Sequence, residues 1–254
     1  MSVNLQTAWG VSRSLAIYYG RPWRFRLMDK FYRRFLCPGD LAFDIGAHLG
    51  NRVRSWRKLG ALVVAVEPQP ALVRVLRLLY GRDPQVQIVA AAVASAAGRV
   101  PLYLNLTNPT ISTTSSDFIA HAAAAPSFRG QRWQEVIEVP AITLDGLIAA
   151  HGQPRFVKID IEGFEADALH GLSQSLPALS VEFVPMHRKV IEAALDRLVQ
   201  LGDYRFNASY GDEMRLLHPR PLALDDIRHW LRDQGNDGPA GDLYASLDPK
   251  LLFF

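Results

Sequence analysis

Short apolar runs alternate with helical patterns along this chain, and this alternation constrains the fold more than any other sequence feature. The runs are almost continuously apolar, which is typical of strands that are covered on both faces. Helical patterns follow at about residues 50–59, 71–80 and 160–172. The sequence therefore predicts an α/β fold, a doubly wound and mostly parallel sheet with helices on both faces. Its predicted strands lie at residues 41–45, 61–67, 86–89, 156–160 and 179–183.

The alternation is interrupted between residues 94 and 148. Residues 99–105 and 136–143 resemble the two strands of a hairpin, and residues 106–134 between them are rich in Ser, Thr and Ala. A loop this long inside a compact domain is usually a lid, a binding loop or a disordered segment. We expect it to form much of a substrate pocket and to close over it. Further on, the sequence predicts a strand at 204–210, a short helix at 225–232 and a last strand at 242–247.

The first 36 residues are basic and aromatic. We interpret residues 1–36 as a covering segment with solvated arginines, in front of one domain of residues 37–254 with an insert at about 99–143. The alternative is a patch that binds a membrane surface or nucleic acid. The net charge of +3 is too small to argue for nucleic acid.

Cysteine, histidine and hydropathy patterns exclude several further classes. The single cysteine, Cys37, allows no intramolecular disulfide, and the seven histidines have no metal-ligand spacing, so no metal is predicted. No apolar run approaches the roughly 18–20 residues that span a bilayer. The first basic residue, Arg13, comes too late for the charged start of a signal peptide. We therefore expect a cytoplasmic protein without a transmembrane segment.

Acidic residues end or nearly end four of the predicted strands: Asp44, Glu67, Asp160 and Glu182. Ligands of open α/β sheets bind at the carboxyl ends of the strands, so the crevice there should be acidic. A phosphate ligand prefers glycine N–H groups with Lys or Arg. An acidic crevice instead favours a ligand with hydroxyls, an amine or a cationic centre.

A glycine turn, Asp44-Ile45-Gly46-Ala47-His48-Leu49-Gly50, follows the first predicted strand. It lacks the middle glycine of G-x-G-x-x-G that lets a pyrophosphate approach. Glu67 closes the next strand at about the distance expected of an acid that binds both ribose hydroxyls. The structural alternative is an ordinary strand–helix turn with acids that cap a helix.

A second acidic motif, at residues 157–165, contains Asp160, Glu162 and Glu165. Acids at this place complement the positive end of a helix dipole, so a structural role is a strong alternative. The position of Asp160 at the end of a central strand, facing the same crevice as Asp44, favours a functional role for Asp160.

Four motifs in this order and spacing resemble the FkbM family of S-adenosylmethionine-dependent methyltransferases. They are residues 43–50, Val66-Glu67-Pro68-Gln69-Pro70, Ile142-Thr143-Leu144-Asp145 and above all residues 157–165. The resemblance implies a class I methyltransferase (Rossmann-like) sheet with a late antiparallel strand, S-adenosylmethionine as cofactor, and O-methylation of a carbohydrate, glycolipid or natural product.

The resemblance also implies the role of individual residues. Asp44, Gly46 and Gly50 fall on the cofactor loop, Glu67 on the ribose acid, and Ala92 near the adenine. The sequence departs from the family pattern at His48, where an asparagine is usual, and at residues 52–53, where a small hydroxyl residue is common.

Methyl transfer to an alcohol needs a base, and the sequence leaves three candidates. Asp160 ranks first, His187 second because its unperturbed pKa of about 6.5 suits the task, and Glu182 third. We expect a small-molecule or glycan acceptor and no nucleic acid. Two other functions stay open, a nicotinamide-dependent oxidoreductase and a non-catalytic binding protein.

Overall fold

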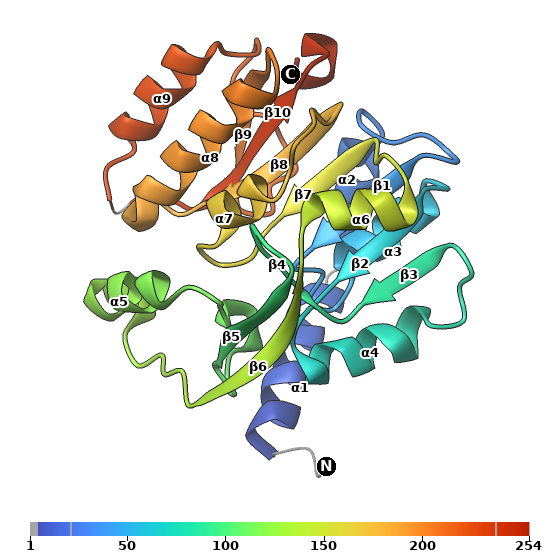
Figure 1. The fold of residues 1–254 in the computed structure, drawn as a ribbon, viewed down its shortest axis with the longest axis vertical. Coiled ribbons are helices and arrows are strands. Elements are labelled where there is room, and N and C mark those ends of the chain that lie inside the picture. The colour runs from blue at the N-terminus through green and yellow to red at the C-terminus, as the bar shows by residue number, and fades with distance from the viewer. Residues whose placement is uncertain (1–4, 21, 237, 254) are drawn as a thin grey trace.

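The computed structural model describes residues 5–20, 22–236 and 238–253. In this part of the chain, seven strands form the central sheet in the order β3-β2-β1-β7-β8-β10-β9 (Figure 1). Neighbouring strands are parallel except β10, which is antiparallel to both β8 and β9. This topology confirms the predicted doubly wound sheet with one late antiparallel strand. The strands are β1 (Leu41–Ile45), β2 (Leu62–Val66), β3 (Val86–Val89), β7 (Phe156–Ile159), β8 (Ala178–Phe183), β9 (Arg205–Tyr210) and β10 (Gly241–Ser246).

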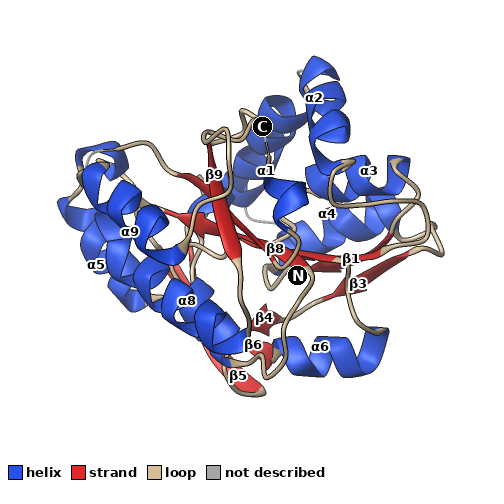
Figure 2. Ribbon diagram, turned by 90° about the horizontal axis from the view of Figure 1, so that it is seen from above, coloured by secondary structure: helices blue, strands red, loops and turns tan. Residues whose placement is uncertain are grey.

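Helices cover both faces of this sheet (Figure 2). Successive side chains of a strand point to opposite faces, so the apolar runs supply two separate cores. Phe43 belongs to the core beneath α6 (Leu144–His151), α7 (Glu165–His170), α8 (Arg188–Leu201) and α9 (Leu224–Asp233). Its neighbour Ala42 belongs to the core beneath α2 (Pro22–Tyr32), α3 (Asn51–Lys58) and α4 (Pro70–Tyr80).

A smaller sheet of β4 (Ala92–Val93), β6 (Glu135–Ile142) and β5 (Gly98–Leu104) lies beside the central sheet. β5 and β6 form the predicted antiparallel pair. The segment between them was expected to be a long loop, but it contains α5 (Ser116–Ala124) and the short 3₁₀ helices Pro109–Ile111 and Pro126–Phe128. α5 forms because Ser115 caps it, accepting a hydrogen bond from Phe118 N at 3.0 Å, and because alanine favours helix.

The N-terminal segment contains α1 (Leu5–Tyr19) and α2. The aromatic side chains of Tyr32 and Phe35 pack against Trp56, Phe156 and Tyr244 over the sheet. The covering role of residues 1–36 and the division at residue 36 stay predictions. None of the described helices is both long and apolar enough to span a bilayer.

Candidate active site

A pocket of about 230 Å³ opens where β1, β2 and β7 end. Residues from both acidic motifs line it, as do residues from the insert and from the C-terminal strand β10. Five of the predicted site residues are among its walls: Gly46, Glu67, Ala92, Asp160 and Glu182. We distinguish a glycine-loop side, formed by Gly46, His48, Glu67, Gln69 and residues 91–93, from an acidic side, formed by Asp160, Glu162, Glu182, Asp212, Asp242 and Arg52.

The turn at Gly46 brings the two sides together. Gly46 N and Ala47 N donate hydrogen bonds to Val66 O at 2.9 and 3.0 Å, which fixes the turn on β2. Gly46 has a φ of 82°, and a Cβ atom there would lie 1.8 Å from the carbonyl oxygen of Asp160. Only glycine therefore allows this close approach of the two loops.

Glu67 is held by the backbone of the glycine-loop side. Its Oε2 accepts a hydrogen bond from His48 N, and its Oε1 accepts one from Gln69 N, both at 2.9 Å. Each carboxylate oxygen keeps a second lone pair for a ligand hydroxyl. Burial raises the pKa of the Glu67 carboxyl to about 7, although the two backbone donors act in the opposite direction.

The insert contributes a polar strip to the pocket wall, consisting of Thr110, Ser112, Thr113 and Thr114. Gln69 Nε2 donates to Pro109 O at 2.9 Å and joins this strip to the glycine-loop side. Thr113 Oγ1 donates to Glu162 O at 2.7 Å and joins it to the acidic side. The strip therefore contacts both sides of the pocket.

Two buried cations organise the acidic side. Lys158 Nζ lies 2.8 Å from Asp160 Oδ2 and 2.9 Å from Asp242 Oδ1. Arg52 lies 3.1 Å from Asp212 and 3.9 Å from Asp242. Burial raises the pKa of Asp160, but Lys158 and Arg52 outweigh it and lower this pKa to about 2. Asp160 is therefore ionised at neutral pH.

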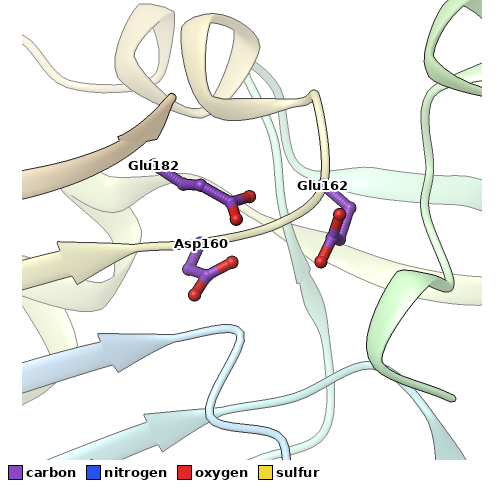
Figure 3. Close-up of side chains that lie close together, drawn as sticks. All are labelled: Asp160, Glu162 and Glu182. Carbon is purple, nitrogen blue, oxygen red and sulfur yellow. The ribbon is translucent and has the colours of Figure 1, made fainter. Parts of the chain in front are cut away.

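Three carboxylates meet on the acidic side, and we call Asp160, Glu162 and Glu182 the acidic triad (Figure 3). One oxygen from each lies within 4.8 Å of the others. Burial and then the neighbouring carboxylates raise the pKa values of Glu162 and Glu182 well above their usual range. The sequence argument treated these acids as lying on separate strands, and the fold brings them together.

Glu165 has the structural role that the sequence left open for this motif. Its Oε1 accepts hydrogen bonds from Ile161 N at 3.0 Å and Gly163 N at 3.2 Å. The side chain is buried and fixes the loop before α7. It therefore positions the two loop residues of the acidic triad without lining the pocket.

Asp44 and Gly50, two of the predicted cofactor-loop residues, do not line the pocket. Asp44 is buried beneath the glycine turn, its Oδ2 has no hydrogen-bond partner among the described residues, and burial raises its pKa to about 6. Gly50 precedes α3 with a φ of 76° and packs against Tyr80 and Leu76. Any contact of Asp44 with a ligand stays a prediction, and the packing of Gly50 explains the need for glycine.

His187, the second candidate base, does not line this pocket. Its ring lies 4.6 Å from the ring of His121 and 6.1 Å from that of Phe118, outside the pocket walls. Burial also lowers its pKa. The sequence placed His187 by its position after a strand, but it could not show that the 3₁₀ helix Pro185–His187 directs the ring toward α5.

Sequence reasoning missed several residues that line or organise the pocket. Lys158 was visible as a lone lysine inside an apolar strand. Arg52 had been noted only as a departure from the family pattern. Tyr18 of α1 lines the pocket beside His48, with ring centroids 5.3 Å apart, and no sequence pattern indicated this. Burial raises the pKa of Tyr18 to about 12 and lowers that of His48 to about 4, so both are neutral at pH 7.

Some solved methyltransferase structures are similar to this chain at low identity. Precorrin-6y C5,15-methyltransferase from Geobacter metallireducens is 11% identical, with a TM-score of 0.44 and coverage of 87% of this chain and 86% of that chain. A TehB-like protein from Corynebacterium glutamicum is 10% identical, with a TM-score of 0.44 and coverage of 92% and 98%. The O-methyltransferase TomG from Streptomyces achromogenes is 10% identical, with a TM-score of 0.43 and coverage of 93% and 88%. Similarity at this level carries no argument about function.

No curated protein matches the sequence significantly. Residues 44–237, which include the glycine turn, Glu67 and the whole acidic triad, match the family described as Methyltransferase FkbM domain. This match covers more than half of the chain and agrees with the resemblance seen in the four motifs. The chain therefore belongs to the FkbM family of methyltransferases.

Proposed function

We propose that this S-adenosylmethionine-dependent methyltransferase methylates a hydroxyl group of a carbohydrate, a glycolipid or another natural product. The family assignment makes the chain a methyltransferase and favours S-adenosylmethionine over the nicotinamide cofactor that Glu67 alone would allow. The identity of the acceptor atom as oxygen is the proposal.

The charge of the pocket is the observation that carries this proposal. Among the described residues, six carboxylates line the pocket against one arginine, Arg52. Carboxylates accept hydrogen bonds from hydroxyl groups, whereas an acceptor rich in phosphate would be repelled. The lining acids are Glu67, Asp160, Glu162, Glu182, Asp212 and Asp242.

The glycine-loop side fits S-adenosylmethionine. Glu67 would accept hydrogen bonds from the ribose hydroxyls, and residues 91–93 would contact the adenine. Gly46 lines the pocket and would lie beside the methionine part, and the unpartnered Oδ2 of Asp44 suits a water-mediated contact with its ammonium. The bound cofactor supplies a methyl group on a positively charged sulfur, and positioning it within about 3–3.5 Å of the acceptor oxygen is the main task of the protein.

We propose that the Asp160–Glu182 pair takes the proton of the acceptor hydroxyl. Both residues line the pocket, whereas His187 does not. Lys158 fixes Asp160 through Oδ2, and Oε2 of Glu182 is buried without a hydrogen-bond partner in the described structure. Such a positioned base contributes roughly 10²–10⁴-fold to the rate.

A screen of hydroxylated acceptors with ¹³C-methyl S-adenosylmethionine tests this function. The carbon chemical shift of the product distinguishes a methyl ether from a methylated nitrogen or carbon. Methylation at nitrogen or carbon alone contradicts the proposal.

The Asp160→Asn variant then tests the base, with Asp226→Asn on the exposed face of α9 as the matched control. We expect Asp160→Asn to lower kcat by roughly 10²–10⁴-fold while the affinity for S-adenosylmethionine stays within a few-fold. If the variant instead loses cofactor binding and keeps its single-turnover rate at saturation, Asp160 is a cofactor ligand and Glu182 is the base to examine.

Three expectations about the surroundings stay predictions: a small-molecule or glycan acceptor without nucleic acid, a cytoplasmic location, and the covering role of residues 1–36. Salt-sensitive binding to random oligonucleotides would favour the nucleic-acid alternative.

A further inference from the structure

We propose that the acidic triad of Asp160, Glu162 and Glu182 binds a hard divalent cation, such as Mg²⁺, at the acceptor end of the pocket. The site itself stands on the geometry of the triad. The role given to the cation below rests on the proposed O-methylation.

The three side chains converge from different elements. Asp160 and Glu162 come from the loop after β7, and Glu182 comes from β8 (Figure 3). Their ligand oxygens lie within 4.8 Å of one another. Oxygens on opposite sides of a cation at about 2.1–2.4 Å are themselves about 4.2–4.8 Å apart, so the triad has the size of a coordination shell. A set of carboxylates selects hard cations such as Mg²⁺, Mn²⁺ and Ca²⁺.

The carboxylate of Glu162 provides a second and separate observation. The residue is only 9% exposed, yet its carboxylate makes no hydrogen bond or ion pair with any described residue. Oε2 of Glu182 is likewise buried without a hydrogen-bond partner in the described structure. Buried carboxylates are normally paired or bound to a metal, so these atoms point to a ligand that neutralises them.

The buried cations Lys158 and Arg52 are paired with other carboxylates and do not neutralise Glu162 and Glu182. Lys158 is shared between Asp160 and Asp242, and Arg52 faces Asp212 and Asp242. Neither cation forms an ion pair with Glu162 or Glu182 in the described part of the chain. A shared proton is the competing way to neutralise the triad, and it predicts no affinity for a metal ion.

The position of the triad suggests what the cation would do. All three residues line the pocket, so a bound ion would keep open coordination positions toward the acceptor. An acceptor with a hydroxyl beside a second oxygen, as in a vicinal diol, would fill two of them. The ion would lower the proton affinity of the bound hydroxyl. The S–C bond of the cofactor would then break with its electron pair left on sulfur, the O–C bond would form, and the hydroxyl proton would pass to a carboxylate or to water.

From the sequence no metal was expected, because the chain has no ligand-spaced motif and its histidines are scattered. The triad contains no histidine, and two of its residues are separated from the third by about one strand–helix unit of sequence. Spacing along the chain therefore could not indicate it.

Direct titration with Mn²⁺ tests the site without any need for an acceptor. The full-length protein is treated with EDTA and desalted, and free Mn²⁺ is followed by electron paramagnetic resonance, with and without S-adenosylmethionine. We expect one site, and we expect Glu162→Gln and Glu182→Gln each to weaken it at least about tenfold. Glu138→Gln, on the exposed face of β6, is the matched control and should bind as the wild type does.

Thermal unfolding of the same samples guards against misfolded variants. Mn²⁺ should raise the Tm of the wild type and of Glu138→Gln, because a ligand that binds only the native state stabilises it. It should leave the Tm of Glu162→Gln nearly unchanged. Without metal, Glu162→Gln should melt no lower than the wild type, because Gln cannot carry the negative charge that burial and the neighbouring carboxylates disfavour at this position.

Two results overturn the cation site: no Mn²⁺ binding to the wild type under either condition, or equal binding by all three variants. Binding of S-adenosylmethionine, measured in the same metal-free sample, keeps this outcome apart from the proposed function. If S-adenosylmethionine binds and Mn²⁺ does not, only the proposed cation site is excluded. If Mn²⁺ binds and no hydroxyl is methylated, only the proposed O-methylation is excluded.

Discussion

The carboxylates on the two sides of the pocket differ in how many hydrogen-bond and ion-pair partners they have. On the glycine-loop side, the single carboxylate of Glu67 receives one backbone N–H on each oxygen. On the acidic side, carboxylates outnumber the cations that face them, and the carboxylate of Glu162 has no hydrogen bond or ion pair with any described residue. The hydrogen bonds that hold Glu67 are formed before a ligand binds, whereas carboxylates on the acidic side still lack partners. A preformed binding site suits the cofactor, which is the same in every turnover. Unpaired carboxylates suit groups that bind and leave during the reaction, such as the acceptor, a cation or a proton.

The two sides touch at Gly46, so the largest effect is expected there. In Gly46→Ala the new methyl group would lie 1.8 Å from Asp160 O, a backbone atom that cannot move without shifting the acidic side. The left-handed φ adds about 1–2 kcal/mol, and the overlap adds about 1–3 kcal/mol. We expect a clear loss of thermal stability and the loss of cofactor binding, measured by calorimetry.

Gly39→Ala is the matched control for this variant. Gly39 has a similar φ of 87°, but no atom lies within 4 Å of its hypothetical Cβ. It should show the conformational cost alone and keep its affinity for S-adenosylmethionine. Equal losses in both variants would mean that the contact between the two sides has no energetic importance.

The fold was predictable where the apolar pattern is local. The predicted strands at residues 41–45 and 86–89 coincide with β1 and β3, because fully buried parallel strands are marked by their own apolar runs. α5 was missed because its alanines show no strong apolar periodicity. β4 has two residues and depends on its partner β6, so no local signal marks it.

The candidate site was predictable on one side only. Glu67 and the glycine turn contact each other across 19 positions within one strand–helix–strand unit, so their spacing is a usable signal. On the acidic side, Lys158 contacts Asp242 across 84 positions. That contact exists only because β10 is antiparallel and lies next to β8. Glu162 has a φ of 55°, and no sequence pattern indicated that its side chain turns toward Glu182.

Removal of the Glu67 carboxylate should affect only the glycine-loop side. We expect Glu67→Ala to weaken binding of S-adenosylmethionine by about 2–4 kcal/mol, because two charge-assisted hydrogen bonds to the ribose are lost and the turn loses its backbone acceptor. Isothermal titration calorimetry measures this. Mn²⁺ binding should be unaffected, and Glu138→Ala should bind the cofactor normally.

Equal cofactor affinity in Glu67→Ala and the wild type would contradict the ribose assignment. A loss of Mn²⁺ affinity in Glu67→Ala would instead show that the two sides of the pocket are energetically coupled.

The raised pKa of Glu67 predicts how the affinity for S-adenosylmethionine depends on pH. With a pKa of about 7, Glu67 takes up a proton as the pH falls through neutrality, and the protonated acid loses an acceptor site for the ribose. Affinity should therefore fall by at most about tenfold between pH 8 and pH 6. His48, with its pKa near 4, stays neutral in this range, and Asp44, with its pKa near 6, contributes only at the lower end.

Titrations of the wild type and of Glu67→Gln at several pH values test this dependence. The Gln variant should bind more weakly but with a flat profile above pH 7. An identical slope in both proteins would assign the proton to another group, with Asp44 the next candidate.

The smallest effect is expected from the polar strip of the insert, which contacts both sides. Trp133 Nε1 donates to Ile111 O at 2.9 Å and holds the 3₁₀ turn that carries Thr110 and Ser112. Trp133→Phe keeps the aromatic packing and removes one hydrogen bond, worth about 0.5–1.5 kcal/mol. Because Gln69 also binds this turn, we expect the Kd for S-adenosylmethionine to rise about two- to tenfold with little change in acceptor KM.

Trp230→Phe on α9, whose indole nitrogen donates no hydrogen bond within the described structure, is the control. A change in acceptor KM alone would place the strip with the acidic side, through Thr113 and Glu162, and would make the insert part of the acceptor site, as its length in the sequence first suggested.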